Sequence, residues 1–434
     1  MTDRVPPTDA VPRTPVPGAG SDNGPGSAPD GGPDQADPTR AYDHPPLVEV
    51  EDGPLGDVRR RAAAVATAIA PEAARWDRED RFPESSWERL RDAGLLGLTV
   101  PRAYGGEGLG VPEACAVLEE LAVACMSSAM VAQLYLNGPP RAIDVLGTEE
   151  QRRRYLPGAV TGERSFAIAI SEPDAGSDAT ALQTRLEPDG DGYRLHGEKC
   201  FITNGIRADT VLVFCRLAGT AGARGIGAVI VESSQDGYAP PRTHLKMGGR
   251  GMPEATLRFD GIRIDPEAVL VAPDPESRRA AGTMLRQFNP ERCGNAAMTL
   301  GVARAALDAA IDHVRTRRQF GREIGEFQGL QWKIADMATR LHAARLVLAD
   351  AAGSNVAGFP DVRRTAMAKV LANETAEHVC REAIQIHGHS GYTRELPLER
   401  YYRDVRGMSL AGGTSEVMRN VLAGEVIGRR YRQR

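Results

Sequence analysis

A glycine-rich turn near the end of the chain, SLAGGTSEV (409–417), runs straight into a predicted helix start. If this turn belongs to a redox active site, Gly412 stands where a reactive acid would be expected, and glycine cannot take a proton. A carboxylate followed by an arginine occurs instead in FNPERCGNAAM (288–298), as Glu291 and Arg292. Taken alone, Glu291 is more typical of a helix start, because the helix dipole stabilises an acid in the first turn.

A loop rich in serine, aspartate and glycine, ISEPDAGSD (170–178), could hold an anion. Gly176 would let backbone N–H groups approach such a ligand, and Ser171 and Ser177 offer hydroxyl groups. The same composition is also that of an ordinary turn, which is the commoner occurrence. This loop alone therefore does not establish a binding site.

The segment GEKCFITNG (197–205) combines a strand pattern with a turn signal. Phe201 and Thr203 are two residues apart, so an aromatic ring and a hydroxyl group fall on one face of a strand. The plain alternative is a buried phenylalanine beside the turn-forming Asn-Gly pair. In the later glycine-rich turn, Thr414 likewise suits a helix N-cap as well as a ligand contact.

Four segments of different composition and periodicity must position these residues. Residues 1–46 are rich in proline and poor in large apolar groups, which predicts a disordered tail. Apolar residues recur at helical spacing over 47–160 and 274–434, whereas 161–273 contains short runs rich in Val, Ile, Phe and Thr. No helical pattern separates those runs, so we expect a β-domain of antiparallel type. A stripe at alternating steps of four and three, from Leu330 to Leu348, predicts a helix that needs a helical partner.

The overall composition excludes several classes of function. A net charge of −5 gives no whole-chain attraction to nucleic acid or to an anionic membrane. No apolar run is as long as a membrane span, and the N-terminus lacks the basic-then-apolar order of a signal peptide. Six scattered cysteines without a C-x-x-C pair predict neither disulfides nor a metal site. We therefore expect a soluble, cytoplasmic protein with no nucleic-acid or membrane partner.

Five segments, in this order along the chain, resemble the acyl-CoA dehydrogenase family, and the resemblance runs from about residue 50 to the C-terminus. They are ISEPDAGSD, GEKCFITNG, RRQFGREIGEFQ (317–328), QIHGHSGY (385–392) and GGTSEV (412–417). The resemblance implies an α+β fold with an N-terminal helical domain, a central antiparallel β-domain and a C-terminal four-helix-bundle domain. It also implies an FAD-dependent homotetramer that dehydrogenates an acyl thioester between Cα and Cβ.

The resemblance further assigns the residues that contact FAD. They are Ser171, Ser177, Phe201, Thr203, Arg317, Gln319, Phe320, Gln328, Gln385, Gly388, His389, Thr414 and Glu416. In this assignment Ser171 touches the flavin ring system, Ser177 the pyrophosphate, and Arg317 the pyrophosphate of a neighbouring subunit's FAD. Two positions depart from the family pattern. Phe201 stands where tryptophan is frequent, and His389 stands where a glycine is common, which allows close backbone approach to phosphate.

The same resemblance assigns the chemistry to two positions. Many relatives have a glutamate at the position of Gly412, where it abstracts the α-proton. A minority, including isovaleryl- and long-chain-type enzymes, have it early in the C-terminal domain. Because Gly412 offers no acid, Glu291 is the predicted base, with Arg292 orienting the backbone around it. The backbone N–H of Gly412 and the FAD ribityl 2′-hydroxyl would hold the thioester oxygen and stabilise the charge that develops there.

The substrate is predicted only as a class. Small residues at Ala411 and Gly412 favour a short or branched acyl group, carried on CoA or on a carrier protein, as in relatives that serve secondary metabolism. Electron-transfer flavoprotein is the expected electron acceptor, and oxygen is the alternative. A flavin oxidase or monooxygenase on the same fold would not need Glu291, and it stands as the second hypothesis.

Overall fold

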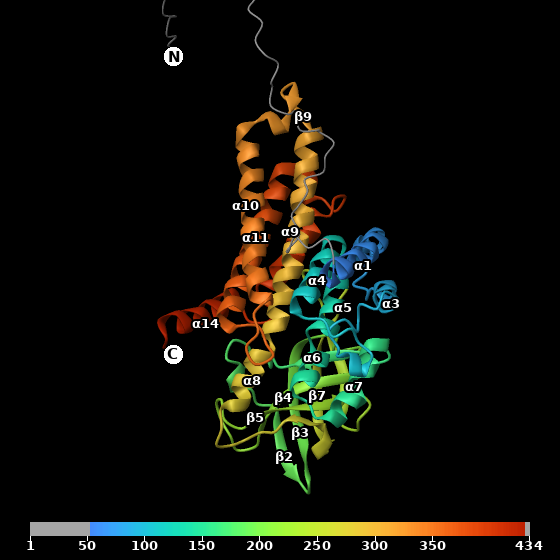
Figure 1. Cartoon of the computed structure of the whole chain (residues 1–434), viewed down its shortest axis with the longest axis vertical. Coiled ribbons are helices and arrows are strands. Elements are labelled where there is room, and N and C mark those ends of the chain that lie inside the picture. Colours follow the sequence, from blue (N-terminus) through green and yellow to red (C-terminus); the bar gives the residue numbers. More distant parts are fainter. Residues whose placement is uncertain (1–52, 430–434) are drawn as a thin grey trace, which may run out of the picture. The chain divides into compact units, whose positions relative to one another are not determined.

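The computed structural model describes residues 53–429, so the tail predicted for residues 1–46 lies outside the described range. Helices, then a sheet, then longer helices follow one another along the chain (Figure 1), which confirms the expected three-domain fold. Among the described residues, no helix is long and apolar enough to cross a membrane. All six cysteines are buried with free thiols.

In the N-terminal helical domain, the two most buried helices are α4 (Val111–Ala124) and α5 (Met126–Leu136). Its other helices are α1 (Pro54–Ile69), α2 (Ala73–Arg78), α3 (Glu84–Asp92), α6 (Pro139–Leu146) and α7 (Glu149–Thr161). A capping box starts α7, because Thr148 Oγ1 accepts from the Gln151 N–H at 3.2 Å and Gln151 Oε1 accepts from the Thr148 N–H at 3.0 Å. Every residue of α5 is buried, so this helix can present its polar side chains only to other elements.

The middle domain is an eight-stranded sheet in the order β6-β7-β3-β2-β4-β5-β8, with β1 also paired to β4. The strands are β1 (Phe166–Ala169), β2 (Arg185–Asp189), β3 (Gly192–Thr203), β4 (Thr210–Leu217), β5 (Ile226–Glu232), β6 (Tyr238–His244), β7 (Glu254–Ile264) and β8 (Val269–Val271). Most neighbours are antiparallel, but β1 and β2 pair with β4 in parallel. The expectation that parallel pairs would be absent without helical crossovers was therefore wrong. The chain returns along the antiparallel strand β3 before it enters β4, so a strand replaces the crossover helix.

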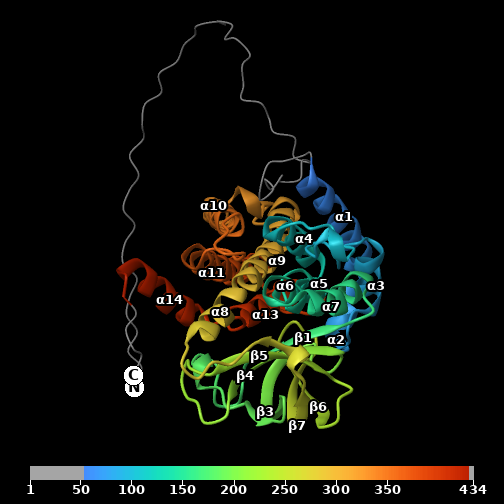
Figure 2. The same cartoon turned by 60° about the horizontal axis from the view of Figure 1, so that its bottom comes forward.

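The C-terminal domain is built around α9, which extends away from the sheet (Figures 1 and 2). Its elements are α8 (Arg279–Gln287), α9 (Asn289–Thr316), β9 (Arg318–Gln319), β10 (Arg322–Glu323), α10 (Gln328–Ala352), α11 (Val362–His387), α12 (His389–Tyr392), α13 (Leu398–Met408) and α14 (Ser415–Ile427). The predicted stripe is confirmed on α10, where Met337, Leu341 and Leu348 are fully buried between α9 and α11. With 28 residues rising 1.5 Å each, α9 spans about 42 Å.

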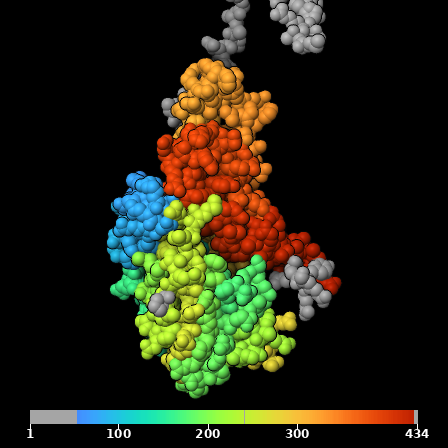
Figure 3. All heavy atoms as spheres, turned by 180° about the vertical axis from the view of Figure 1, so that it is seen from behind, coloured from blue at the N-terminus to red at the C-terminus, as the bar shows by residue number. Residues whose placement is uncertain are grey.

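The loop between β6 and β7 (245–253) belongs to the middle domain and contacts both helical domains. Arg250 Nη2 lies 2.5 Å from Asp80 Oδ2 after α2, and the backbone N–H of Gly249 donates to Asp404 Oδ1 of α13 at 2.7 Å. Figure 3 shows this yellow-green segment between the blue N-terminal helices and the red C-terminal ones. The loop therefore connects the N-terminal domain to α13, the helix that leads directly into the glycine-rich turn.

Candidate functional site

Glu291 lies in the first turn of α9, with part of its carboxylate withdrawn from water. Its Oε1 is sealed from solvent and has no hydrogen-bond partner, although the residue as a whole is partly exposed. Burial raises the pKa of Glu291 to about 8, and the charge of Arg292 offsets only part of the rise. A carboxylate that served only the helix start would have its charged form stabilised, so its pKa would fall. A raised pKa in a protected position instead suits a group that takes a proton from a substrate.

Arg292 connects the start of α9 to the glycine-rich turn. Its Nε donates to the carbonyl oxygen of Gly412 at 3.0 Å, and its Nη1 donates to Asn289 Oδ1 at 2.9 Å. Burial lowers the pKa of Arg292 to about 10, which leaves the guanidinium charged at neutral pH. Gly412 has a φ of 68°, in the left-handed region that glycine enters without strain. The arginine next to the predicted base thus holds the residue whose backbone is predicted to bind the thioester oxygen.

Three buried side chains that the sequence analysis missed hold the end of α13, just before the same turn. Asn295 Nδ2, Lys369 Nζ and Asn373 Nδ2 donate to the carbonyl oxygen of Met408 at 3.1, 3.1 and 3.0 Å. Burial lowers the pKa of Lys369 to about 7, and the nearby charge of Arg292 acts in the same direction. The available signal was a lysine and an asparagine one helical turn apart within an apolar, alanine-rich helix.

A buried ion pair links the two loops that are predicted to bind the flavin. Lys199 Nζ is fully buried and donates to Glu172 Oε1 at 2.7 Å and to the carbonyl oxygen of Ile170 at 2.8 Å. Burial alone would raise the pKa of Glu172, but the Lys199 ammonium and two backbone N–H donors together lower it. Between these contacts, the carbonyl of Ser171 accepts from the Cys200 N–H at 2.9 Å. The pair therefore fixes Ser171 against the strand that carries Phe201.

Phe201 and Thr203 lie at the end of β3. Phe201 has a φ of 57°, uncommon outside glycine, and it lies where the β3–β7 register shifts at a bulge. Its side chain is 62% exposed, and its ring centroid is 5.1 Å from that of His244. The plain alternative of a buried phenylalanine is therefore wrong. An exposed aromatic ring on a strained backbone is typical of a ligand contact.

A second group of predicted cofactor residues lies at the far end of α9. Arg317 directly follows α9, and Gln319 and Phe320 belong to the β9–β10 hairpin. Gln328 begins α10, and all four side chains are exposed. Phe320 is 92% exposed at a φ of 52°, and Arg317 makes no ion pair within residues 53–429.

The end of α11 adds the next three predicted residues to this second group. Gln385, Gly388 and His389 are exposed there, and a Cβ added at Gly388 would meet nothing within 4 Å. The ring of His387 stacks on that of His313 with centroids 4.1 Å apart, which joins the end of α11 to the end of α9. Gly388, at a φ of 63°, thus leaves open space beside the backbone.

Thr414 and Glu416 lie at the start of α14, directly after the glycine-rich turn. Thr414 Oγ1 accepts from the Val417 N–H at 3.2 Å, which confirms that Thr414 is a helix N-cap. Glu416 is exposed, and hydrogen bonds from its own backbone N–H and from Thr414 lower its pKa. Their contacts with a cofactor stay predictions.

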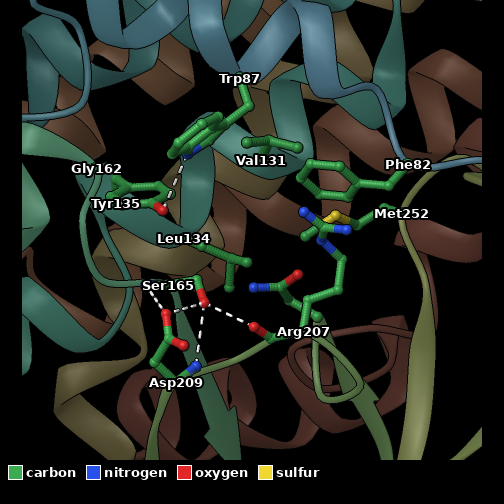
Figure 4. Close-up of a pocket in the computed structure, with 11 residues that line it drawn as sticks. Phe82, Trp87, Val131, Leu134, Tyr135, Gly162, Ser165, Arg207, Asp209 and Met252 are labelled. Carbon is green, nitrogen blue, oxygen red and sulfur yellow. Dashed lines mark hydrogen bonds between the residues drawn. The ribbon is translucent and has the colours of Figure 1, made fainter.

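A cavity of about 270 Å³ lies apart from these groups, between helices α3 and α5 and the loop that follows β3 (Figure 4). Its walls include Trp87, Tyr135 and Arg207, whose guanidinium lies 4.0 Å from the ring centroid of Phe82. None of the predicted catalytic or cofactor residues lines this cavity, so we assign it no role in the chemistry.

The predicted cofactor residues fit FAD in their chemistry, but within one chain they form two separate groups. Hydroxyl groups and the exposed ring of Phe201 suit a flavin, and the exposed guanidinium of Arg317 suits a pyrophosphate. The first group lies at the sheet, where Phe288 before α9 packs against Phe214 of β4 at 6.2 Å between ring centroids. The second group lies at the other end of α9, a helix about 42 Å long. Within a single chain, the two groups are therefore separated by the length of this helix.

Comparisons with known proteins match all three domains. Family models described as acyl-CoA dehydrogenase N-terminal, middle and C-terminal domain match residues 57–163, 167–262 and 281–427. The chain is 39% identical to 3-sulfinopropanoyl-CoA desulfinase of Variovorax paradoxus, over 87% of this chain and 95% of that protein. It is 38% identical to acryloyl-CoA reductase (NADH) of Anaerotignum propionicum, over 83% and 91%. It superposes on butyryl-CoA dehydrogenase of Megasphaera elsdenii with a TM-score of 0.83, 30% identity and coverage of 88% and 100%.

Proposed function

Because this chain belongs to the acyl-CoA dehydrogenase family, we propose that it removes hydrogen from Cα and Cβ of an acyl thioester to give the trans-2-enoyl thioester. The observation that carries the proposal is Glu291, a protected carboxylate with a pKa raised to about 8, whose neighbour Arg292 holds Gly412. FAD is the cofactor of the family, and when bound it supplies the acceptor for the β-hydrogen, which leaves as hydride.

In this proposal Glu291 is the general base. With a pKa of about 8, roughly one-tenth of the carboxylate is ionised at pH 7. The higher pKa makes the ionised form a stronger base, which a weakly acidic α-proton requires. Because Glu291 lies on a helix, its position is set by the backbone, whose carbonyl accepts from Gln133 Nε2 at 3.0 Å.

The backbone N–H of Gly412 is the proposed donor to the thioester oxygen. A donor whose position is fixed before the reaction stabilises the developing charge without reorganisation. The turn is held on both sides of this residue, by Arg292 at the carbonyl of Gly412 and by the three donors at Met408. These contacts support a preorganised oxyanion site.

A short acyl group is the proposed substrate. By their names, the relatives act on 3-sulfinopropanoyl-CoA and acryloyl-CoA, which carry three-carbon acyl groups, and the solved structure is of a butyryl-CoA dehydrogenase. The relatives' names also cover three different reactions within one family. The presence of Glu291 favours dehydrogenation over desulfination, because dehydrogenation needs a base beside Cα; reduction is the reverse reaction and would use the same group as an acid.

We also propose that the cofactor site is completed across subunits of a homotetramer. The two groups of predicted FAD residues lie toward opposite ends of α9, a helix about 42 Å long, and this separation supports the arrangement. The exposed side chains of Phe320 and Arg317 would then face the FAD of a neighbouring subunit.

Anaerobic mixing of the FAD-loaded protein with a panel of acyl-CoA thioesters tests the proposal. We expect rapid bleaching of the flavin with short acyl groups, and a reduction about a hundredfold slower or more in Glu291→Gln, with FAD content unchanged. Bleaching that is as fast in the variant as in the parent would refute Glu291 as the base. Reoxidation by oxygen, instead of by electron-transfer flavoprotein, would favour the oxidase alternative. Faster bleaching with acyl-carrier-protein thioesters than with acyl-CoA thioesters would show that the acyl group is carried on a carrier protein.

A further inference from the structure

Three buried oxygen atoms have no hydrogen-bond partner within the described residues: one belongs to the predicted base itself and two to asparagine side chains. They are Glu291 Oε1, Asn295 Oδ1 and Asn137 Oδ1. Asn137 and Asn295 are only 1% and 6% exposed, so bulk water does not solvate them. An unpaired buried polar atom costs about 1–3 kcal/mol, and such atoms in native proteins usually meet a ligand or an ordered water.

Two of the three oxygens belong to residues of α9, and the third belongs to the residue that follows α5. Asn295 follows Glu291 by four residues, so the two side chains project from the same face, about 6 Å apart along the axis. Asn137, after α5, reaches this region of the helix at Gly294, where an added Cβ would lie 2.8 Å from Asn137 Nδ2. A side chain at Gly294 would therefore displace the amide, and glycine leaves it room.

The surrounding hydrogen bonds determine which amide atom stays unpaired. Asn295 Nδ2 donates to the carbonyl of Met408, which turns its Oδ1 elsewhere. The carbonyl of Glu291 requires the NH₂ group of Gln133, and Gln133 Oε1 then accepts from Asn137 Nδ2 at 3.0 Å. The unpaired atoms are therefore all acceptors, one from a carboxylate and two from amides.

We propose that the amide oxygens of Asn295 and Asn137 bind a hydrogen-bond donor on the acyl group, so that the preferred substrate carries a hydroxyl or N–H group near the end of a short acyl chain. The inference rests on the proposed function, because it takes Cα to lie beside Glu291. The 6 Å between Glu291 and Asn295 corresponds to about four C–C bonds, which places the donor on the fifth carbon of the acyl group. An acyl group that ends in an anion would meet the same two amide oxygens and be disfavoured.

The test compares thioesters that differ only by hydroxyl against methyl. The FAD-loaded protein is mixed anaerobically with 5-hydroxypentanoyl-CoA or hexanoyl-CoA, and kcat/KM for flavin reduction is measured for each. We expect the parent to favour the hydroxylated thioester by about tenfold or more, as one well-formed hydrogen bond predicts. A third arm with 5-aminopentanoyl-CoA distinguishes an N–H donor from a hydroxyl donor.

Asn295→Leu and Asn373→Leu form a matched pair of variants. Each removes one of the three donors to the Met408 carbonyl, but only Asn295 carries an unpaired oxygen, because Asn373 Oδ1 accepts from Thr299 Oγ1 at 3.2 Å. We expect Asn295→Leu to lose the preference for hydroxyl over methyl, in kcat/KM and in calorimetric binding to the FAD-loaded protein. Asn373→Leu should keep the preference of the parent, whatever its absolute rate.

The possible outcomes separate this inference from the proposed function. Equal reduction by the hydroxyl and methyl thioesters in the parent would overturn the inference, and bound water would then pair with the three oxygens. An equal loss of preference in Asn295→Leu and Asn373→Leu would also overturn it, because the effect would belong to the Met408 contact. If no acyl thioester bleaches the flavin, it is the proposed function that fails.

Discussion

The raised pKa of Glu291 makes the free energy of unfolding depend on pH, and Glu291→Gln would remove that dependence. In the folded protein the pKa is about 8, whereas the ordinary value of a glutamate is 4.5. Below pH 4.5 both states hold the proton, so the carboxyl group has no differential effect. Between pH 4.5 and about 8 the unfolded chain releases the proton while the folded protein keeps it, and stability falls as the pH rises.

The size of the effect follows from the two pKa values. Their separation corresponds to about 5 kcal/mol, which is fully developed above pH 8 and absent below pH 4.5. Glutamine has nearly the same shape but no charge, so Glu291→Gln should be more stable than the parent by several kcal/mol at pH 9. At pH 5 the two proteins should differ by less than about 1 kcal/mol.

Urea unfolding of the FAD-loaded parent and variant, at one protein concentration and at pH values from 5 to 9, measures this difference. Other groups such as Lys369 titrate in both proteins, so the parent-minus-variant difference isolates Glu291. Glu395→Gln is the control, because this carboxylate is exposed and lies outside the predicted site. A parent-minus-variant difference that stays constant from pH 5 to pH 9 would refute a desolvated Glu291, and with it the reason for assigning the base there.

Three further outcomes are expected. Lys199→Met leaves Glu172 buried without its partner, so we expect a loss of about 3–5 kcal/mol in unfolding free energy together with weaker FAD retention; unchanged stability would show that the pair is replaceable. Arg317→Ala should release FAD, seen as loss of flavin absorbance after gel filtration. In sedimentation of the parent, a monomer that keeps FAD would contradict a site shared between subunits. Moving the acid with Glu291→Gly and Gly412→Glu should restore part of the rate lost in Glu291→Gly, at a cost of about 1–2 kcal/mol for a glutamate at φ 68°. A Cβ at Gly412 has room, since its nearest contact is at 3.8 Å, so a double variant no faster than Glu291→Gly would count against a shared α-proton.

The spacing of apolar residues along the sequence predicted the helices but not how the strands pair. The stripe on α10 was visible because burial against α9 and α11 repeats with the helical period. The parallel pairing of β1 and β2 with β4 was not predictable in the same way, because it depends on which strand lies next to which in space. Local spacing carries no information on that choice.

In the candidate site, too, the sequence identified residues but not the contacts between distant parts of the chain. Glu291 and Gly412 could be found from residue types in recognisable segments, but the contact from Arg292 to Gly412 joins residues 120 positions apart. Lys369 escaped prediction because a lysine in a helix is usually solvated. Only the packing of α13 against α11 shows that this ammonium is fully buried and directed at a carbonyl.

The two halves of the proposed site are supported by different parts of the chain. Glu291 depends on α5, because Gln133 holds the carbonyl of Glu291 and Gly294 leaves the space that the amide of Gln133 requires. The N–H of Gly412 depends instead on α11 and α13, through the donors at Met408. With the acid on a helix, the turn needs only to present its backbone, and glycine at a positive φ can do so without strain. Arg292 is the residue common to both halves, because it follows Glu291 in sequence and binds the carbonyl of Gly412.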